Sequence, residues 1–190
     1  MSAVQVRRWT RHEYDHMIEA GVLTPEDHLE LIDGEILATT PQGSAHATGV
    51  SLAQEALRAA FGSEAHIRAQ LPLALGSDSE PEPDVAVVAG STRDYRDAHP
   101  RAAMLVVEVA DTTLAHDRDV KGSLYARAGV PEYWILNPTE RHLEVYRDPK
   151  PVAKARFGWR YETVERLGPG RSVSSLALPS ASFAVADLLP

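Results

Sequence analysis

Three ionisable side chains in the middle of the sequence could together cleave a phosphodiester. Asp84 precedes the apolar run 85–89, Glu108 lies near the end of a second apolar run at 104–109, and Lys121 follows in a segment with helical spacing. Two carboxylates on neighbouring strands can share a hard cation such as Mg²⁺ or Mn²⁺, and an ammonium beside them can stabilise the developing phosphate charge. If the three groups converge, the sequence predicts a nuclease with Asp84 and Glu108 as the metal ligands.

Each of these residues also has an ordinary structural interpretation. Asp84 could cap a turn, Glu108 could pair with an arginine, and Lys121 could pair at the surface with Asp117, four residues earlier. Two carboxylates buried close together without a cation are costly, because like charges raise the pKa of one of them. Pro83 favours a strand entry, where the next side chain can reach solvent and substrate. A cation is therefore the natural partner of the two carboxylates.

The elements that must position these residues follow from turn residues and apolar spacing. Asp33-Gly34 between two short apolar runs indicates a hairpin, and Thr10 with Glu13 forms a capping box. Tyr125, four residues after Lys121, would share its helix face. We predict helices at 11–20, 44–61 and 117–128; strands at 29–32, 35–38, 65–75, 85–89, 104–109, 132–136, 143–146 and 160–164; breaks at 41–43 and 90–101; and a terminal turn at 184–189.

Length and composition limit the class of protein to which this chain can belong. With 190 residues, 44% of them hydrophobic, the chain can bury a core as one domain. It has no cysteine, which excludes a disulfide framework, thiolate zinc sites and a cysteine nucleophile. No stretch approaches the roughly 20 apolar residues of a membrane span. We therefore expect a cytoplasmic protein with no membrane partner.

The net charge of −8 opposes a nucleic-acid partner held by broad phosphate neutralisation. The objection is partial, because carboxylates that bind cations add to the acidic count and a local basic patch can coexist with an acidic remainder. Two groups of basic residues could form such a patch: Arg7, Arg8 and Arg11 near the start, and Arg141, Arg147, Lys150, Lys154, Arg156 and Arg160 in the later part. A solvated face is the alternative for each group.

The order of motifs after residue 82 is distinctive. Pro83-Asp84 is followed by a run ending Val-Val-Glu-Val, by Asp-Arg-Asp-Val-Lys at 117–121, and by Tyr-Ala-Arg-Ala-Gly-Val-Pro-Glu-Tyr-Trp-Ile-Leu-Asn-Pro at 125–138. Together with Glu-Leu-Ile-Asp-Gly-Glu at 30–35 and the later His46, this order resembles the Uma family of restriction-endonuclease-like proteins, within the PD-(D/E)xK nuclease superfamily. The resemblance covers residues 10–148 and, more weakly, the tail.

The resemblance implies an α+β fold, restriction-endonuclease-like, with a central mixed β-sheet flanked by helices. It also implies a nuclease-like core at 24–148 within a single domain spanning 1–190, with an N-terminal helix and a C-terminal strand as extensions. By resemblance Asp84 and Glu108 are metal ligands and Lys121 is the catalytic lysine. An acidic residue from an early element often completes the cation site in this superfamily, and Glu30 or His46 could supply that ligand.

One departure separates this chain from the superfamily pattern. The lysine is expected two residues after the glutamate, where this chain has Ala110, so Lys121 must be a relocated substitute. The preferred hypothesis remains a Mg²⁺-dependent endonuclease acting on nucleic acid, with DNA favoured. The competing hypothesis is a catalytically weak or inactive nuclease fold that serves as a binding or assembly module, such as a homodimer. Acidic net charge and the displaced lysine favour the second hypothesis, and retention of all three polar residues opposes it.

Overall fold

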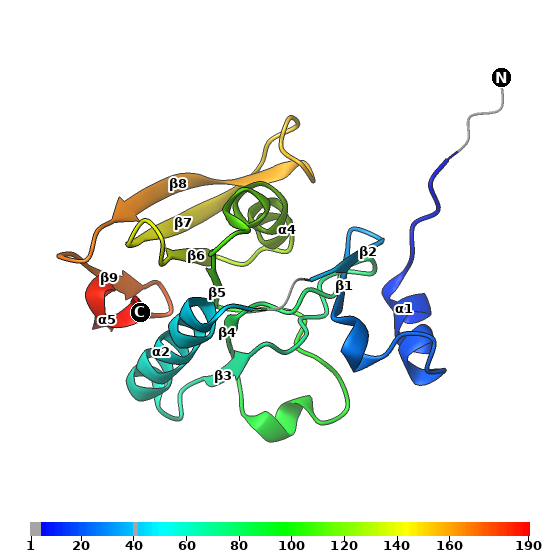
Figure 1. Cartoon of the computed structure of the whole chain (residues 1–190), viewed down its shortest axis with the longest axis horizontal. Helices are drawn as coiled ribbons and strands as arrows, with labels where there is room; N and C mark the ends of the chain where they lie inside the picture. The colour runs from blue at the N-terminus through cyan, green and yellow to red at the C-terminus, as the bar shows by residue number, and fades with distance from the viewer. Residues whose placement is uncertain (1–4, 40–41) are drawn as a thin grey trace.

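The computed structural model describes residues 5–39 and 42–190, and its centre is a six-stranded mixed sheet with the order β3-β4-β5-β6-β7-β8 (Figure 1). Strands β5 and β6 are parallel and the other neighbours are antiparallel. The sheet strands are β3 His66–Ala69, β4 Val85–Val88, β5 Leu105–Val109, β6 Glu132–Asn137, β7 His142–Pro151 and β8 Trp159–Leu167. This confirms the predicted α+β class with a central mixed sheet.

The remaining elements flank this sheet or extend it. The helical segments are α1 Arg11–Glu19, η1 Pro25–Asp27, α2 Ser44–Phe61, η2 Thr92–Tyr95, α3 Leu114–His116, η3 Asp117–Lys121, α4 Gly122–Arg127 and α5 Val185–Leu188. Two hairpins form separate small sheets, β1 Leu29–Ile32 with β2 Glu35–Ala38, and β9 Ser172–Ser175 with β10 Leu178–Ala184. Among the described residues, no helix is long and apolar enough to span a membrane.

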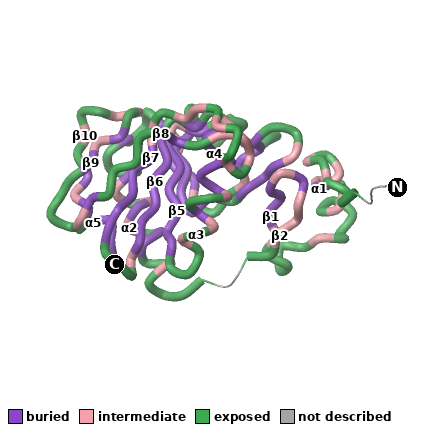
Figure 2. The backbone as a smooth tube through the Cα atoms, turned by 90° about the horizontal axis from the view of Figure 1, so that it is seen from above, coloured by how far each residue is buried: buried purple, intermediate pink, exposed green. Residues whose placement is uncertain are grey.

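The sheet is covered on both faces, and Figure 2 shows its buried strands between more exposed outer segments. One apolar cluster joins α2, α5 and the β9–β10 hairpin to the side chains of Val85, Val107 and Trp134. The opposite cluster joins α4 to Ala86, Val106 and neighbouring tyrosines. Because alternate residues of each strand face opposite clusters, a charged residue in these strands must either lie at a strand end or find a buried partner.

Three predicted elements differ from the structure. The strand expected at 65–75 ends at Ala69, because Gln70 adopts a positive φ of 51° and Pro72 has no amide hydrogen to donate. The helix expected at 117–128 begins earlier, at Leu114, and contains a π-helical turn at 117–121. The β9–β10 hairpin was not predicted, and the terminal turn at 184–189 is the short helix α5. The break predicted at 41–43 lies partly outside the described residues.

The β1–β2 hairpin turns at Asp33-Gly34 as predicted, with φ of 50° and 78°. An added Cβ on Gly34 would lie 2.7 Å from the Arg8 Cβ and 3.1 Å from the Trp9 carbonyl oxygen. The hairpin is docked on the following segment, where the Gly34 amide donates to the Asp78 carbonyl at 2.7 Å. Glycine is therefore required at position 34 for two reasons: the turn there is left-handed, and the N-terminal segment approaches its backbone closely.

We expect Gly34→Ala to destabilise the protein more than Gly21→Ala does. Both glycines have positive φ, but an added Cβ at Gly21 meets nothing within 4 Å. Left-handed strain alone should cost Gly21→Ala about 1–2 kcal/mol, and the clash at Gly34 should add roughly as much again. Urea unfolding of the two variants measures the difference. Equal losses would contradict a close approach at Gly34.

Candidate active site

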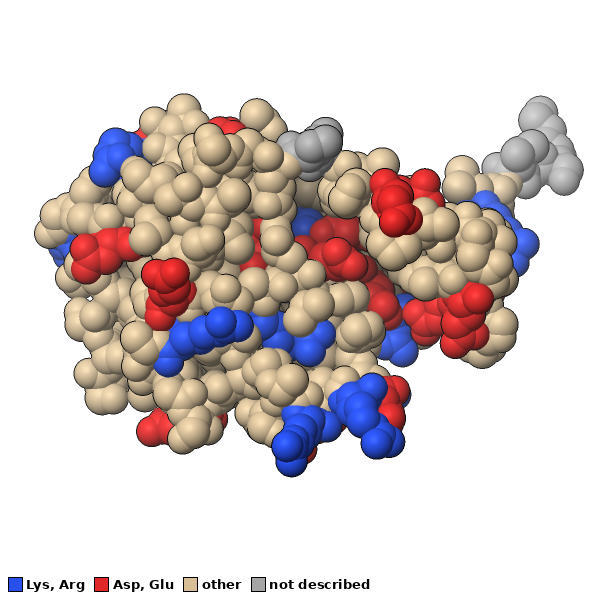
Figure 3. Space-filling view, turned by 60° about the horizontal axis from the view of Figure 1, so that its bottom comes forward, with Lys and Arg blue, Asp and Glu red and all other residues tan. Residues whose placement is uncertain are grey.

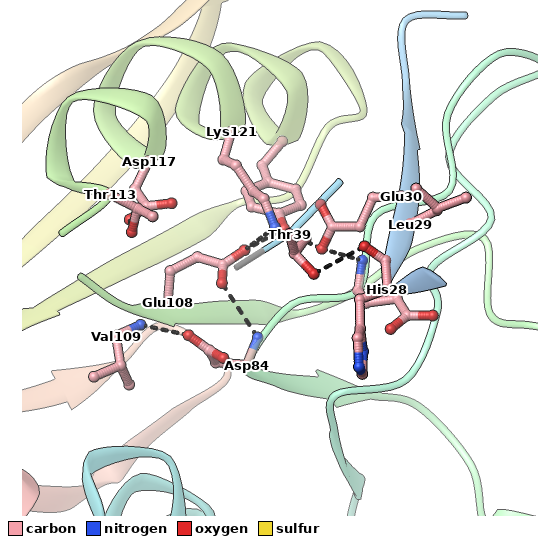
Figure 4. Close-up of polar contacts among 12 residues, drawn as sticks. His28, Leu29, Glu30, Thr39, Asp84, Glu108, Val109, Thr113, Asp117 and Lys121 are labelled. Carbon is pink, nitrogen blue, oxygen red and sulfur yellow. Dashed lines mark hydrogen bonds and ion pairs between the residues drawn. The ribbon is translucent and has the colours of Figure 1, made fainter. Parts of the chain in front are cut away.

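The antiparallel register of β4 and β5 places Asp84 opposite Glu108. Val85 pairs with Val107, so the preceding and following residues face each other on the side of the sheet that carries α4. The backbone also links them, because the Asp84 amide donates to Glu108 Oε2 at 3.2 Å and the Val109 amide donates to Asp84 Oδ2 at 2.8 Å (Figure 4). The two predicted metal ligands therefore lie side by side, both buried.

Lys121 reaches these carboxylates from the helical crossover between β5 and β6. Its Nζ lies 3.2 Å from Glu108 Oε1 and 3.0 Å from Glu30 Oε1. The Tyr125 hydroxyl donates to the same Glu108 oxygen at 2.6 Å. Lys121 is only 7% exposed, so the surface pairing with Asp117 is not what the structure shows. Asp117 instead accepts a hydrogen bond from the Thr113 hydroxyl at 2.5 Å.

The π-helical turn at 117–121 allows this approach. The Gly122 amide donates to the Asp117 carbonyl, five residues back, and the Tyr133 hydroxyl donates to the same oxygen at 3.1 Å. A side chain inserted into the hydrogen-bond ladder widens the turn, and such turns recur at functional sites. Lys121 is the last residue of the widened turn, and it points at Glu108 together with Tyr125, one turn later.

The opposite side of this helix is anchored to the sheet. Arg118 makes a two-pronged ion pair with Glu144 on β7, which also accepts from the Tyr146 hydroxyl at 2.6 Å and lies 3.0 Å from His142 Nε2. These contacts, led by the Arg118 hydrogen bond, outweigh burial and lower the pKa of Glu144 to about 2. The anchor fixes the helix that carries Lys121.

Glu30 and His46 both reach the site, but through different partners. Glu30 Oε1 accepts from the Glu82 amide at 3.1 Å as well as from Lys121. His46 Nε2, from the first turn of α2, lies 2.9 Å from Asp84 Oδ1. Burial lowers the pKa of His46, but the hydrogen bond to Asp84 and the negative charges of Asp84, Asp111 and Asp117 together outweigh it and leave the pKa raised. Glu30 thus orients the lysine, and His46 orients the aspartate.

Negative charge predominates in the site. Figure 3 shows acidic side chains inside the crevice between the lobe formed by α1 and the first hairpin and the larger body of the molecule. Burial raises the pKa of Glu108 to about 8, although Lys121 opposes the shift. Burial also raises the pKa of Asp117. The Lys121 pKa is raised because Glu108 and Glu30 outweigh its own burial, so the ammonium stays charged.

The donor set fits a magnesium-type cation held by two carboxylates. No cluster of three or more His, Asp or Glu side chains that could hold a metal is found in residues 5–39 and 42–190. Mg²⁺, however, keeps several waters and commonly takes one or two carboxylates. The hydrogen bonds that these carboxylates accept from His46 and from the Val109 and Asp84 amides leave lone pairs free on Asp84 and on Glu108 Oε2. A cation beside these oxygens would also relieve the excess of negative charge.

The sequence interpretation missed three contributors to this geometry. The π-helical turn has no signal in residue type, and the Tyr133 hydroxyl that donates to its Asp117 carbonyl comes from a later strand. The Arg118 anchor depends on Glu144, which is distant in the chain. The sequence showed Glu82 only as the residue before Pro83 and gave no sign that its amide would donate to Glu30.

A mixed sheet with two carboxylates on adjacent antiparallel strands and a lysine beside them defines a restriction-endonuclease-like fold. The family model described as "Uma2: Putative restriction endonuclease" matches residues 11–186, and the chain belongs to this family. Among solved structures, the fold is similar to that of a putative nuclease belonging to DUF820 from Anabaena variabilis. The identity is 19%, the TM-score is 0.64, and the match covers 86% of this chain and 90% of that chain. None of the curated proteins compared with the chain matches it significantly.

We expect the metal-free protein to lose stability as pH rises through about 8. The pKa of Glu108 in the folded protein lies above its ordinary value of 4.5, so between pH 4.5 and about 8 the folded state binds more protons than the unfolded state does. The stabilisation from this bound proton is therefore lost progressively as the pH rises from 4.5 through about 8. Glu108→Gln should remove this part of the pH dependence, worth a few kcal/mol at most.

Chemical unfolding from pH 5 to pH 9 in the presence of a chelator measures the effect. Glu55→Gln, on the exposed face of α2, is the matched control and should follow the wild-type profile. A wild-type profile retained by Glu108→Gln would show that this carboxyl titrates normally.

Proposed function

We propose that this protein is a Mg²⁺- or Mn²⁺-dependent endonuclease that hydrolyses nucleic-acid phosphodiester bonds, with DNA as the favoured substrate. The observation that carries the proposal is the convergence on Glu108 of Lys121, Tyr125 and the Asp84 amide. Membership of a family described as restriction endonucleases supports the same class of reaction. The two carboxylates support the choice of metal, and the family description supports DNA as the substrate.

Asp84 and Glu108 would hold the cation, which when bound supplies Lewis-acid stabilisation of the phosphate and an acidified water. Their positions are fixed before substrate arrives, because the Val109 and Asp84 amides, His46 and Tyr125 already orient the four oxygens. Preorganised ligands of this kind need no rearrangement during the reaction.

Lys121 would donate to an oxygen of the phosphate. An ammonium has three N–H groups, and the contacts with Glu30 and Glu108 occupy two of them. The third can therefore point at a substrate oxygen. Its raised pKa keeps the donor protonated at neutral pH. Glu30 serves as a positioning residue for this ammonium.

The displaced lysine supports a second candidate function. Ala110 occupies the position where the superfamily pattern has lysine, and the net charge of −8 opposes broad contact with phosphates. A nuclease fold with a weak or unused site could act as a binding or assembly module, for example as a homodimer. Cleavage that depends on Lys121 would support the nuclease, and absence of such cleavage would support the binding or assembly module.

We expect Asp84→Asn, Glu108→Gln and Lys121→Met each to lower cleavage by at least about 100-fold, because each removes a group that acts on the metal or on the transition-state charge. Cleavage of supercoiled plasmid and of single-stranded DNA with Mg²⁺ or Mn²⁺ measures this loss. Glu55→Gln controls for an exposed change of the same type. Equal nicking by wild type and all variants would mean that the activity belongs to a contaminant.

Divalent cations should also stabilise the chelator-treated protein. Binding to the folded state at a hundred times Kd adds about 2.7 kcal/mol, so the melting temperature should rise with Mg²⁺ or Mn²⁺ concentration. Asp84→Asn should abolish the rise. The exposed Asp119→Asn, two residues from Lys121, should retain it. A rise that Asp84→Asn leaves unchanged would place the cation elsewhere.

A further inference from the structure

Among the described residues, most members of the two basic groups pair with a carboxylate or a backbone carbonyl, and three do not. Arg7 pairs with Glu13, Arg8 with Asp33 and Glu35, Arg11 with Glu80, Arg147 with Glu132 and Lys150 with Glu162, while Arg141 donates to the Pro190 carbonyl. Within residues 5–39 and 42–190, no carboxylate forms an ion pair with Lys154, Arg156 or Arg160. These three side chains all line one hollow.

The hollow has a volume of about 690 Å³ and lies between the η3–α4 helix and the long β7–β8 hairpin. In Figure 1, α4 is seen nearly end-on against β7 and β8. The half-buried ring of Trp159 and the edges of Tyr146 and Tyr161 contribute its aromatic wall. Volumes of this order hold a small molecule or one to two nucleotides, and the hollow is too confined for a duplex. Cationic side chains around an aromatic surface are the usual combination for single-stranded nucleic acid.

The hollow and the carboxylate site occupy opposite sides of one helix. Lys121 and Tyr125 face Glu108, whereas Arg118, Gly122 and Ser123 line the hollow.

We infer that this hollow binds an unpaired segment of the nucleic-acid substrate, with a base stacked on Trp159 and phosphates contacted by Lys154, Arg156 and Arg160. The inference rests on the proposed nuclease function and specifies its substrate as a nucleic acid with a single-stranded flank. An unpaired base can stack on a protein ring, whereas both faces of a base pair inside a duplex are covered by its neighbours. Asp119 and Glu162 also line the hollow, but its basic side chains outnumber them. This local excess of positive charge also explains how a chain of net charge −8 could hold a polyanion.

Binding is measured in EDTA, so that no cleavage can occur, by fluorescence anisotropy of a labelled twelve-nucleotide oligo-dT and of a blunt hairpin duplex of matched length. We expect the single strand to bind at least tenfold more tightly. The triple variant Lys154→Gln/Arg156→Gln/Arg160→Gln should weaken single-strand binding at least tenfold. It should also reduce the slope of log K against log salt by about 2, as expected for the loss of three phosphate contacts.

A triple variant with the same change of charge is the control. Arg93→Gln/Arg101→Gln/Arg171→Gln alters three exposed arginines outside the hollow and should change single-strand affinity less than twofold. Oligo-dT should quench tryptophan fluorescence in wild type but not in Trp159→Phe, a variant that keeps an aromatic ring in the same place. Unchanged thermal unfolding of each variant shows that it is folded.

Equal loss in the two triple variants, equal affinity for single strand and duplex, or full quenching in Trp159→Phe would overturn the inference. The test is separable from that of the proposed function. If the hollow variant binds normally while cleavage still requires Asp84 and Lys121, only the hollow inference fails. If single-strand binding requires the hollow but Asp84→Asn leaves cleavage unchanged, only the proposed function fails.

Discussion

The buried carboxylate of Glu108 is the point at which the separate parts of this protein meet. One oxygen accepts from the Tyr125 hydroxyl and faces Lys121, and the other accepts from the Asp84 amide. A carboxylate that is 4% exposed needs hydrogen-bond donors and an opposite charge close to it. The neighbouring strand and the crossover helix both supply such partners, so the contacts of this one side chain fix the strand and the helix relative to each other.

The first hairpin is drawn into the same arrangement by the second partner of Lys121. Glu30 stabilises the ammonium, and its strand is held by an antiparallel bridge between Leu31 and Glu80. Arg127 on α4 also pairs with Asp33 in the hairpin turn and with Asp78. Hairpin, sheet and crossover helix therefore enclose the lysine from three directions. This enclosure keeps the ammonium buried and charged.

The parts of this arrangement that the sequence predicted are those with local causes. Pro83-Asp84 before an apolar run and Glu108 near the end of another predict carboxylates at neighbouring strands, and Asp33-Gly34 predicts the hairpin turn. Contacts between distant segments left no comparable signal: Glu30 and Lys121 are 91 residues apart. The β9–β10 hairpin was missed because Ser-Val-Ser-Ser at 172–175 has little apolar alternation, and its stability comes from Phe183 packing against Trp134.

Moving the lysine from the strand to a helix changes what the site depends on. A lysine two residues after Glu108 would share the strand and be positioned by the sheet register alone, as Asp84 is. Lys121 depends instead on the rotation of the helix, which the Tyr133 hydroxyl sets on one side and the Arg118–Glu144 pair sets on the other. Because Arg118 and Tyr146 also border the hollow beside the β7–β8 hairpin, the contacts that hold the lysine in register also shape that hollow. The position of Lys121 on the helix thus ties the geometry of its ammonium to the neighbouring surface, a coupling that a strand-borne lysine would not create.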